Sequence, residues 1–149
     1  MLDLVRHLLG EQSTAKVEPG HELDMAIAIL LIEVARADKE EHPAEMDVVR
    51  RLLSTRFNLN DEERGELMAR AGREAEHMVS LQGFTRQLVD ALSESQRGEI
   101  IGQLWQVALS DGSLDPEEEL LVRRIADLLY VRHSEFIRQK HLAEQYLEK

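Results

Sequence analysis

Five of the ten residues from 110 to 119 are carboxylates, and this stretch is the part of the sequence best suited to chemistry. Asp111, Asp115 and Glu118 surround a turn that Gly112 can make. Calcium and magnesium ions are bound by several carboxylate and carbonyl oxygens, which such a turn supplies. The spacing differs from that of the EF-hand loop, which has ligands at alternate positions and a glutamate at its end. The turn is therefore a candidate cation site of another kind.

The same turn occurs a second time in the chain. At a fixed offset of 73, residues 27–51 match residues 100–124 at ten of 25 positions without a gap. Between unrelated segments of ordinary composition, roughly one or two matches are expected. The polar identities pair Asp38 with Asp111, Pro43 with Pro116 and Glu45 with Glu118. Because turn residues are repeated along with apolar ones, the two segments are copies of one unit.

Helix capping explains part of this pattern without any ligand. Asp115 is a favourable N-cap, Pro116 suits the first helical position, and Glu118 follows the cap by three residues. Asp111 is harder to explain, because an acid in the last turn of a helix lies at the negative end of its dipole. The first copy nevertheless keeps an aspartate there, Asp38. Capping alone and cation binding are both open alternatives.

The elements that position the two turns are all predicted to be helices. Every periodic stretch has helical spacing, and no apolar–polar alternation is sustained over the length of a strand. Residues 10–20 have the composition of a polar connector. The predicted helices are a short one at 2–9 and longer ones at 22–37, 43–57, 60–79, 81–92, 95–110, 116–130 and 134–147.

This order predicts an all-α protein built as a single helical bundle. A helix pair at 22–57 is followed by two further helices, a second copy of the pair at 95–130 and a closing helix. We expect the pairs to pack about a pseudo-twofold axis, because two copies are too few for an open solenoid. The predicted domain spans residues 21–149, after an N-terminal helix and connector at 1–20. Trp105, on the apolar helix of the second copy, is predicted to lie in the core.

Composition and charge restrict the classes of partner. The chain has 29 acidic and 18 basic residues, a net charge of -11. Such a field repels phosphate backbones and anionic lipid surfaces, so we expect neither nucleic-acid binding nor membrane insertion. The most apolar run, residues 25–32, is much shorter than the ~20 residues of a membrane-spanning helix. The first residues lack the features of a secretory signal, and we expect a cytoplasmic protein.

Familiar catalytic patterns are missing from the sequence. The chain has no cysteine, and no serine lies in a nucleophile elbow. His21-Glu22-Leu23-Asp24-Met25 begins like a zinc-protease motif but has methionine where the second histidine is required. We expect His133 at a helix start and the other histidines at the surface, with a role only for His42, which lies beside Glu41 and near Glu45. The protein is therefore expected not to be an enzyme.

Both copies follow one pattern: an apolar helix, an aspartate, a short turn, Pro-x-Glu, and then Val-Arg-Arg with an apolar residue after it. In this pattern, and in Phe84-Thr85-Arg86-Gln87-Leu88 and Leu128-Leu129-Tyr130, the chain resembles the TerB-like family of tellurite-resistance proteins over residues 22–145. The same module occurs at the front of certain membrane-anchored DnaJ-type co-chaperones. The resemblance implies a two-repeat helical bundle with a metal site formed by the acidic residues of the two turns. On this chain those residues are Asp38, Glu45, Asp111 and Glu118.

The first turn departs from the family pattern at two positions. Lys39 replaces the glycine that the second turn has as Gly112, and His42 stands where the second turn has Asp115. The charge of Lys39 repels a cation, and histidine is a poor ligand for calcium or magnesium. We therefore expect the second turn to contribute more, with Glu41, His42 and Asp115 as secondary candidates. Calcium or magnesium is the favoured ion, whereas zinc would make His42 an asset.

Three functions are compatible with the sequence. The leading one is a non-enzymatic stress-response or co-chaperone-type binding module that senses a divalent cation and binds a protein partner. The second is a metal-dependent enzyme with a two-metal site in the two turns, against which the lack of a histidine ligand set and of a nucleophile counts. The third is a structural interaction domain without a ligand. Self-association into a homo-oligomer is compatible with all three.

Overall fold

The computed structural model describes residues 19–37, 43–77 and 80–148, except for the side chains of residues 19–22. Within these ranges the chain forms seven helices and no strand. They are α3 (Pro19–Ala35), α4 (Pro43–Phe57), α5 (Asp61–His77), α6 (Gln82–Ala91), α7 (Glu94–Leu109), α8 (Pro116–Leu128) and α9 (His133–Leu147). The predicted all-α fold is confirmed. The predicted short helix at 2–9 lies outside the described residues.

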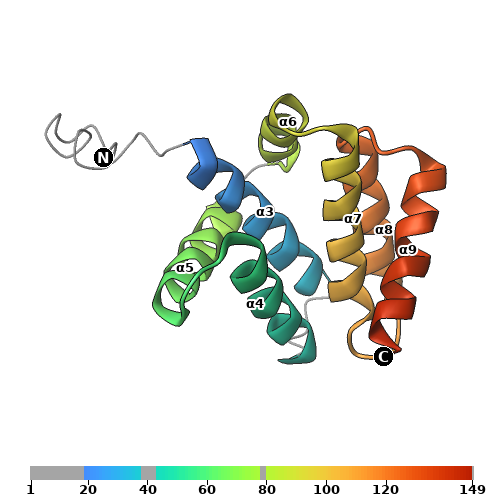
Figure 1. The fold of residues 1–149 in the computed structure, drawn as a ribbon, viewed down its shortest axis with the longest axis horizontal. Helices are drawn as coiled ribbons and strands as arrows, with labels where there is room; N and C mark the ends of the chain where they lie inside the picture. The colour runs from blue at the N-terminus through green and yellow to red at the C-terminus, as the bar shows by residue number, and fades with distance from the viewer. Residues whose placement is uncertain (1–18, 38–42, 78–79, 149) are drawn as a thin grey trace, which may run out of the picture.

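The helices form two groups of three, and α6 connects the groups (Figure 1). In the first group α4 and α5 both pack on α3, and in the second group α8 and α9 both pack on α7. The groups meet through α3 and α7. Each of these two helices also contacts the second helix of the other group, α3 with α8 and α7 with α4. A pseudo-twofold arrangement requires such reciprocal contacts. The superposition of the helix pair α3–α4 on the pair α7–α8 stays a prediction.

The first helix of each group forms the core. The seven consecutive residues from Ala26 to Ile32 on α3 are all buried, so this helix is apolar on every side, as expected of a central helix. On α7, Trp105 is fully buried and its indole Nε1 donates to the backbone oxygen of Phe136 at 3.1 Å. The two rings lie 5.0 Å apart. The predicted core position of Trp105 is confirmed.

Prolines mark three of the helix starts. Pro19, Pro43 and Pro116 are each the first residue of a helix, where the missing backbone N–H removes no hydrogen bond. The predicted connector at 10–20 is therefore too long at its end, because Pro19 begins α3 three residues before the predicted start at Glu22. The start of this helix was placed too late because Pro19 was assigned to the connector.

Reciprocal capping bonds fix two further helix starts. At α7, the N-cap Ser93 accepts from the N–H of Gln96 at 3.1 Å, and the Gln96 side chain accepts from the N–H of Ser93 at 2.8 Å. At α5, Asn60 and Glu63 make the same exchange, at 2.8 and 3.0 Å. Both are capping boxes, one closed by glutamine and one by glutamate.

The second helix of each group ends in the same way. Asn58 after α4 and Tyr130 after α8 both have left-handed backbones, with φ of 54° and 56°. The next residue, Leu59 or Val131, then donates its N–H to a carbonyl one turn back, at 3.2 and 2.9 Å. These bonds are those of the Schellman motif, which satisfies carbonyls at a helix end. The two groups thus share structure beyond the matched ranges 27–51 and 100–124.

Candidate functional site

Glu45 and Glu118, which the internal repeat pairs, are both buried. Each is the third residue of its helix, and the exposed fraction is 0% for Glu45 and 1% for Glu118. Their neighbours Ala44 and Glu117 are exposed. A buried carboxylate is costly unless opposite charge or hydrogen bonds compensate for the lost water. The repeated burial of a glutamate is therefore more than surface capping requires.

The local sequence explains why these two glutamates turn inward. Val49 and Val122 lie four residues after them, one helical turn along the same face. Both valines are fully buried, because α4 and α8 are packed against both α3 and α7. The sequence contains a signal for this burial. In both copies of the repeat, the glutamate is followed four residues later by a valine.

The second turn is shaped by its own carboxylates. Asp115 is the N-cap of α8, and its Oδ1 accepts from two N–H groups of the first turn, at 2.8 and 3.3 Å. Asp111 is exposed, and its Oδ1 accepts from the N–H of Ser113 at 3.1 Å. Gly112 between them has a φ of 90°, a conformation that favours glycine. The predicted N-cap role of Asp115 is confirmed.

A surface hollow brings the end of α3 against the start of α8. Ala37, the residue before Asp38, and Glu117, the residue before Glu118, both line it. The other lining residues are Glu33, Arg36, Leu120, Leu121 and Arg124. The chain therefore enters the first turn beside the start of α8. Proximity of this kind is the condition under which two turns can share an ion.

The charges that line this hollow are balanced, with two glutamates and two arginines. Burial raises the pKa of Glu33 above its usual value, and the charge of Arg36 partly offsets the rise. The pKa of Glu33 is raised because water is partly excluded from its carboxylate where α3 meets α8. This dehydration concerns Glu33, whereas Glu117, which lines the same hollow, is exposed.

The structure describes only part of the predicted site. Three of the predicted residues lie outside the described ranges, namely Asp38, Glu41 and His42. Within those ranges no group of three or more histidine, cysteine, aspartate or glutamate residues could hold a metal ion. Glu45, Asp111 and Glu118 thus do not form such a group by themselves. The predicted site accordingly depends on Asp38 as well and stays a prediction.

Two further sequence expectations can be compared with the structure. His133 is the first residue of α9, as predicted, and His77 and His141 are exposed. Of the helices that the structure describes, none has the length and apolar character needed to cross a membrane.

Comparison with known proteins identifies one family. The family model described as tellurite resistance protein TerB matches residues 24–141. The matched range includes both acidic turns and the whole of α4 to α8. No curated protein and no solved structure matches the chain.

Proposed function

The chain belongs to the TerB family of tellurite-resistance proteins, and from this premise we propose that it is a non-enzymatic binding module whose two acidic turns hold a divalent cation. The proposed ligands are Asp38 and Glu45 from the first turn and Asp111 and Glu118 from the second. In this proposal the module acts in the cytoplasm as a stress-response or co-chaperone-type protein, and the ion adjusts its binding to a protein partner.

One observation carries the proposal. Glu45 and Glu118 occupy the same position in two copies of one unit, and both are removed from water. Dehydrated carboxylates repel one another and attract cations more strongly than exposed ones do. The approach of the end of α3 to the start of α8 in a common hollow supports the sharing of one ion.

The chemistry of the proposed ligands fits a hard cation. All four are carboxylates, and calcium and magnesium prefer oxygen ligands, whereas zinc in proteins is bound mainly by thiolate and imidazole. A bound ion would compensate for the buried negative charge and would fix the two turns relative to each other. It would therefore couple the two helical groups where α3 meets α8.

Thermal unfolding in the presence of metal ions tests the proposal. After treatment with EDTA, addition of calcium or magnesium should raise the Tm of the protein, because a ligand that binds only the folded state stabilises it by mass action. The Glu118→Gln variant should lose this rise. The Glu117→Gln variant, with the same charge change at an exposed neighbouring position, should keep it. An ion-induced rise that is equal in both variants would refute the assignment.

Two aspartate variants test the contribution of each turn. Asp111→Asn keeps an oxygen that can accept from Ser113 N–H but removes the charge, so it should abolish ion binding without unfolding the turn. Asp38→Asn should only weaken binding, because Lys39 already opposes a cation in that turn, and Lys39→Gly should strengthen it. Equal effects of the two aspartate variants, with no gain from Lys39→Gly, would show that the turns are equivalent.

Titration calorimetry separates the alternatives. One ion per chain supports the proposal, whereas two ions per chain favour a two-metal enzyme. The absence of heat with calcium, magnesium, manganese and zinc at millimolar concentration favours a structural interaction domain. If zinc is the preferred ion, His42→Ala should reduce the affinity of the chain for zinc. The same change should leave the affinity for calcium or magnesium unchanged.

A further inference from the structure

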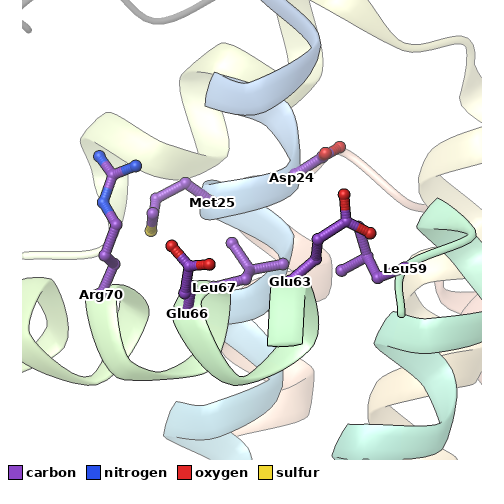
Figure 2. Close-up of a pocket in the computed structure, with 7 residues that line it drawn as sticks. All are labelled: Asp24, Met25, Leu59, Glu63, Glu66, Leu67 and Arg70. Atoms are coloured by element: carbon purple, nitrogen blue, oxygen red, sulfur yellow. The ribbon is translucent and has the colours of Figure 1, made fainter. Parts of the chain in front are cut away.

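A second hollow lies between α3 and α5, on a different face from the contact of α3 with α8. Figure 2 shows it with Asp24 and Met25 contributed by α3 and four residues by α5. Its apolar lining consists of Met25, Leu59 and Leu67, and its acidic residues are Asp24, Glu63 and Glu66. Arg70 is the single basic residue of the lining. The hollow thus combines an apolar wall with three carboxylates.

The second helical group shows why α3 and α5 leave this space. On α7, Gly98 and Gly102 face Glu135 and Gln139 of α9 so closely that a Cβ at Gly102 would collide with the Gln139 side chain. At the repeat offset of 73, these glycines correspond to Met25 and Ile29 on α3. Of these two residues, Met25 lines the hollow. The first group thus has a large apolar side chain in the hollow at the position where the second group has a glycine.

The charges of the hollow are arranged along its length. In Figure 2 the carboxylates of Asp24 and Glu63 lie near one end, Glu66 lies beside Met25, and Arg70 lies at the other end. Glu66 and Arg70 make no ion pair with another residue in the described part of the chain. Glu63 uses one carboxylate oxygen to accept from the N–H of Asn60, and its charge is retained. The end away from Arg70 therefore holds the carboxylates of Asp24 and Glu63 beside an apolar surface, and the charge of Arg56 offsets part of that of Asp24.

We propose that this hollow binds a lysine or arginine side chain of a partner protein, next to an apolar residue of the same segment. The aliphatic stem of a basic side chain can lie over Met25 and Leu67 while its charged end reaches the carboxylates of Glu63 and Glu66. The net charge of the chain, -11, attracts such a segment from a distance. Arg70 is the one lining residue that repels such a side chain, and it lies at the end away from Asp24 and Glu63.

The chemistry of the lining favours a basic peptide over other ligands. The described residues offer no group of three acidic or histidine ligands that could hold a metal ion, so the three carboxylates of this hollow do not form a metal site. An anionic ligand would meet three carboxylates and one arginine. The proposed site is also separate from the two acidic turns, and its test does not depend on ion binding there.

The test uses a short fluorescent peptide with an arginine beside a leucine, added to the full chain. Fluorescence anisotropy should show saturable binding, and the double variant Glu63→Gln with Glu66→Gln should weaken it about fivefold or more, as expected for the loss of two partly screened charges. Glutamine can close the capping box that Glu63 makes, since Gln96 does so at α7, so the variant should remain folded. Circular dichroism of the variant checks that it is folded.

A matched control uses the far end of the same helix. Glu74 and Glu76 are exposed and lie outside the hollow, so the double variant Glu74→Gln with Glu76→Gln makes the same charge change. It should bind the peptide with nearly the affinity of the native chain. Equal weakening in both double variants would show attraction to the overall charge alone and would overturn the proposal.

Two arginines on α5 provide a second, opposite test. Arg70→Glu adds a carboxylate to the hollow and should strengthen peptide binding, whereas Arg73→Glu changes the net charge equally outside the hollow and should have little effect. The proposal is overturned if a peptide that has the leucine but no arginine binds with the affinity of the arginine–leucine peptide. It is also overturned if spermidine binds with that affinity, or if the arginine–leucine peptide shows no saturable binding. A dimer of the chain that the Glu63→Gln and Glu66→Gln changes dissociate would also overturn it, by assigning the hollow to a second copy.

Discussion

The contact of α7 with α9 and the contact of α3 with α5 have the same topology but different packing. In the second group, two glycines let α9 approach closely, and Trp105 and Phe136 fill the remaining space. In the first group, Met25 stands where Gly98 does, and the surface between the helices is hollowed. A repeated unit can thus keep its fold while one copy becomes a rigid core and the other offers a binding surface.

Polar side chains sharpen this contrast. Within α9, Gln139, which is buried against α7, donates to Glu135 at 2.8 Å, and Arg138 pairs with the same carboxylate at 2.9 Å. Between α3 and α5, Glu66 and Arg70 face the hollow without such a pairing in the described residues. Carboxylates that are satisfied within the chain have less to gain from a ligand. The first group is therefore the more suitable one for an external cationic group.

The largest expected effect concerns the aromatic centre of the tight contact. Trp105→Ala should lower the free energy of unfolding by about 4 kcal/mol, since it leaves a large cavity and removes the bond to the Phe136 carbonyl. Leu67→Ala, on the half-buried wall of the hollow, should cost only about 1–2 kcal/mol. Urea denaturation of both variants measures the difference. Equal losses would mean that the two contacts are equally important for stability.

A substitution that copies the first group into the second should break the tight contact. Gly102→Ile introduces the residue that stands at position 29 and should cost about 2–3 kcal/mol by overpacking, because it displaces Gln139. Gly65→Ala on α5, where an added Cβ meets nothing within 4 Å, should instead stabilise the protein by about 0.5–1 kcal/mol. Urea denaturation measures both changes, and a harmless Gly102→Ile would show that α9 can move away freely.

The two left-handed helix ends provide a smaller comparison. Asn58 tolerates a positive φ, whereas Tyr130 has the same backbone with a ring that is 71% exposed and so gains little from burial. Tyr130→Asn should therefore raise stability by about 0.5–1 kcal/mol, and Asn58→Tyr should lower it by a similar amount. Thermal unfolding of the pair checks the signs. A loss of stability in Tyr130→Asn would indicate a contact of the ring that outweighs the backbone strain.

Helical periodicity was sufficient to predict the fold. Six of the seven described helices begin within two residues of the predicted start. Proline, asparagine, serine or aspartate marks the starts of α4, α5, α7 and α8, whereas α6 and α9 begin after Leu81 and Arg132 without a side-chain cap. The third helix of each group was not recognised as part of the repeat. Its sequence has diverged, and only the tertiary contacts and the shared Schellman ends at Asn58 and Tyr130 relate α5 to α9.

The candidate site was only partly predictable. The offset of 73 identified Glu45 and Glu118, but their burial depends on how α4 and α8 pack against the central helices. The hollow between α3 and α5 could not be predicted at all. Its lining combines residues of α3 and α5 with Leu59, and their proximity follows from the packing of the helices rather than from a sequence pattern.

The smallest expected effect concerns two glutamates with opposite pKa shifts, one in each group. Hydrogen bonds from Arg138 and Gln139 lower the pKa of Glu135, so its stabilising contribution is present above about pH 4.5 and is lost as the pH falls through the lowered value. Burial raises the pKa of Glu33, so its charge opposes folding at neutral pH, and this cost disappears as the pH falls through the raised value.

Substitution by glutamine should therefore change neutral-pH stability in opposite directions. Glu135→Gln should lower it and Glu33→Gln should raise it, the latter by less than about 1 kcal/mol because solvent screens a half-exposed group. The Glu33→Gln difference from the native chain should shrink as the pH falls through the raised pKa and be gone below about 4.5, whereas the Glu135→Gln difference should shrink only below about pH 4.5. Urea denaturation across the acid range measures both curves. A destabilised Glu33→Gln at neutral pH would mean that its pairing with Arg36 outweighs its dehydration.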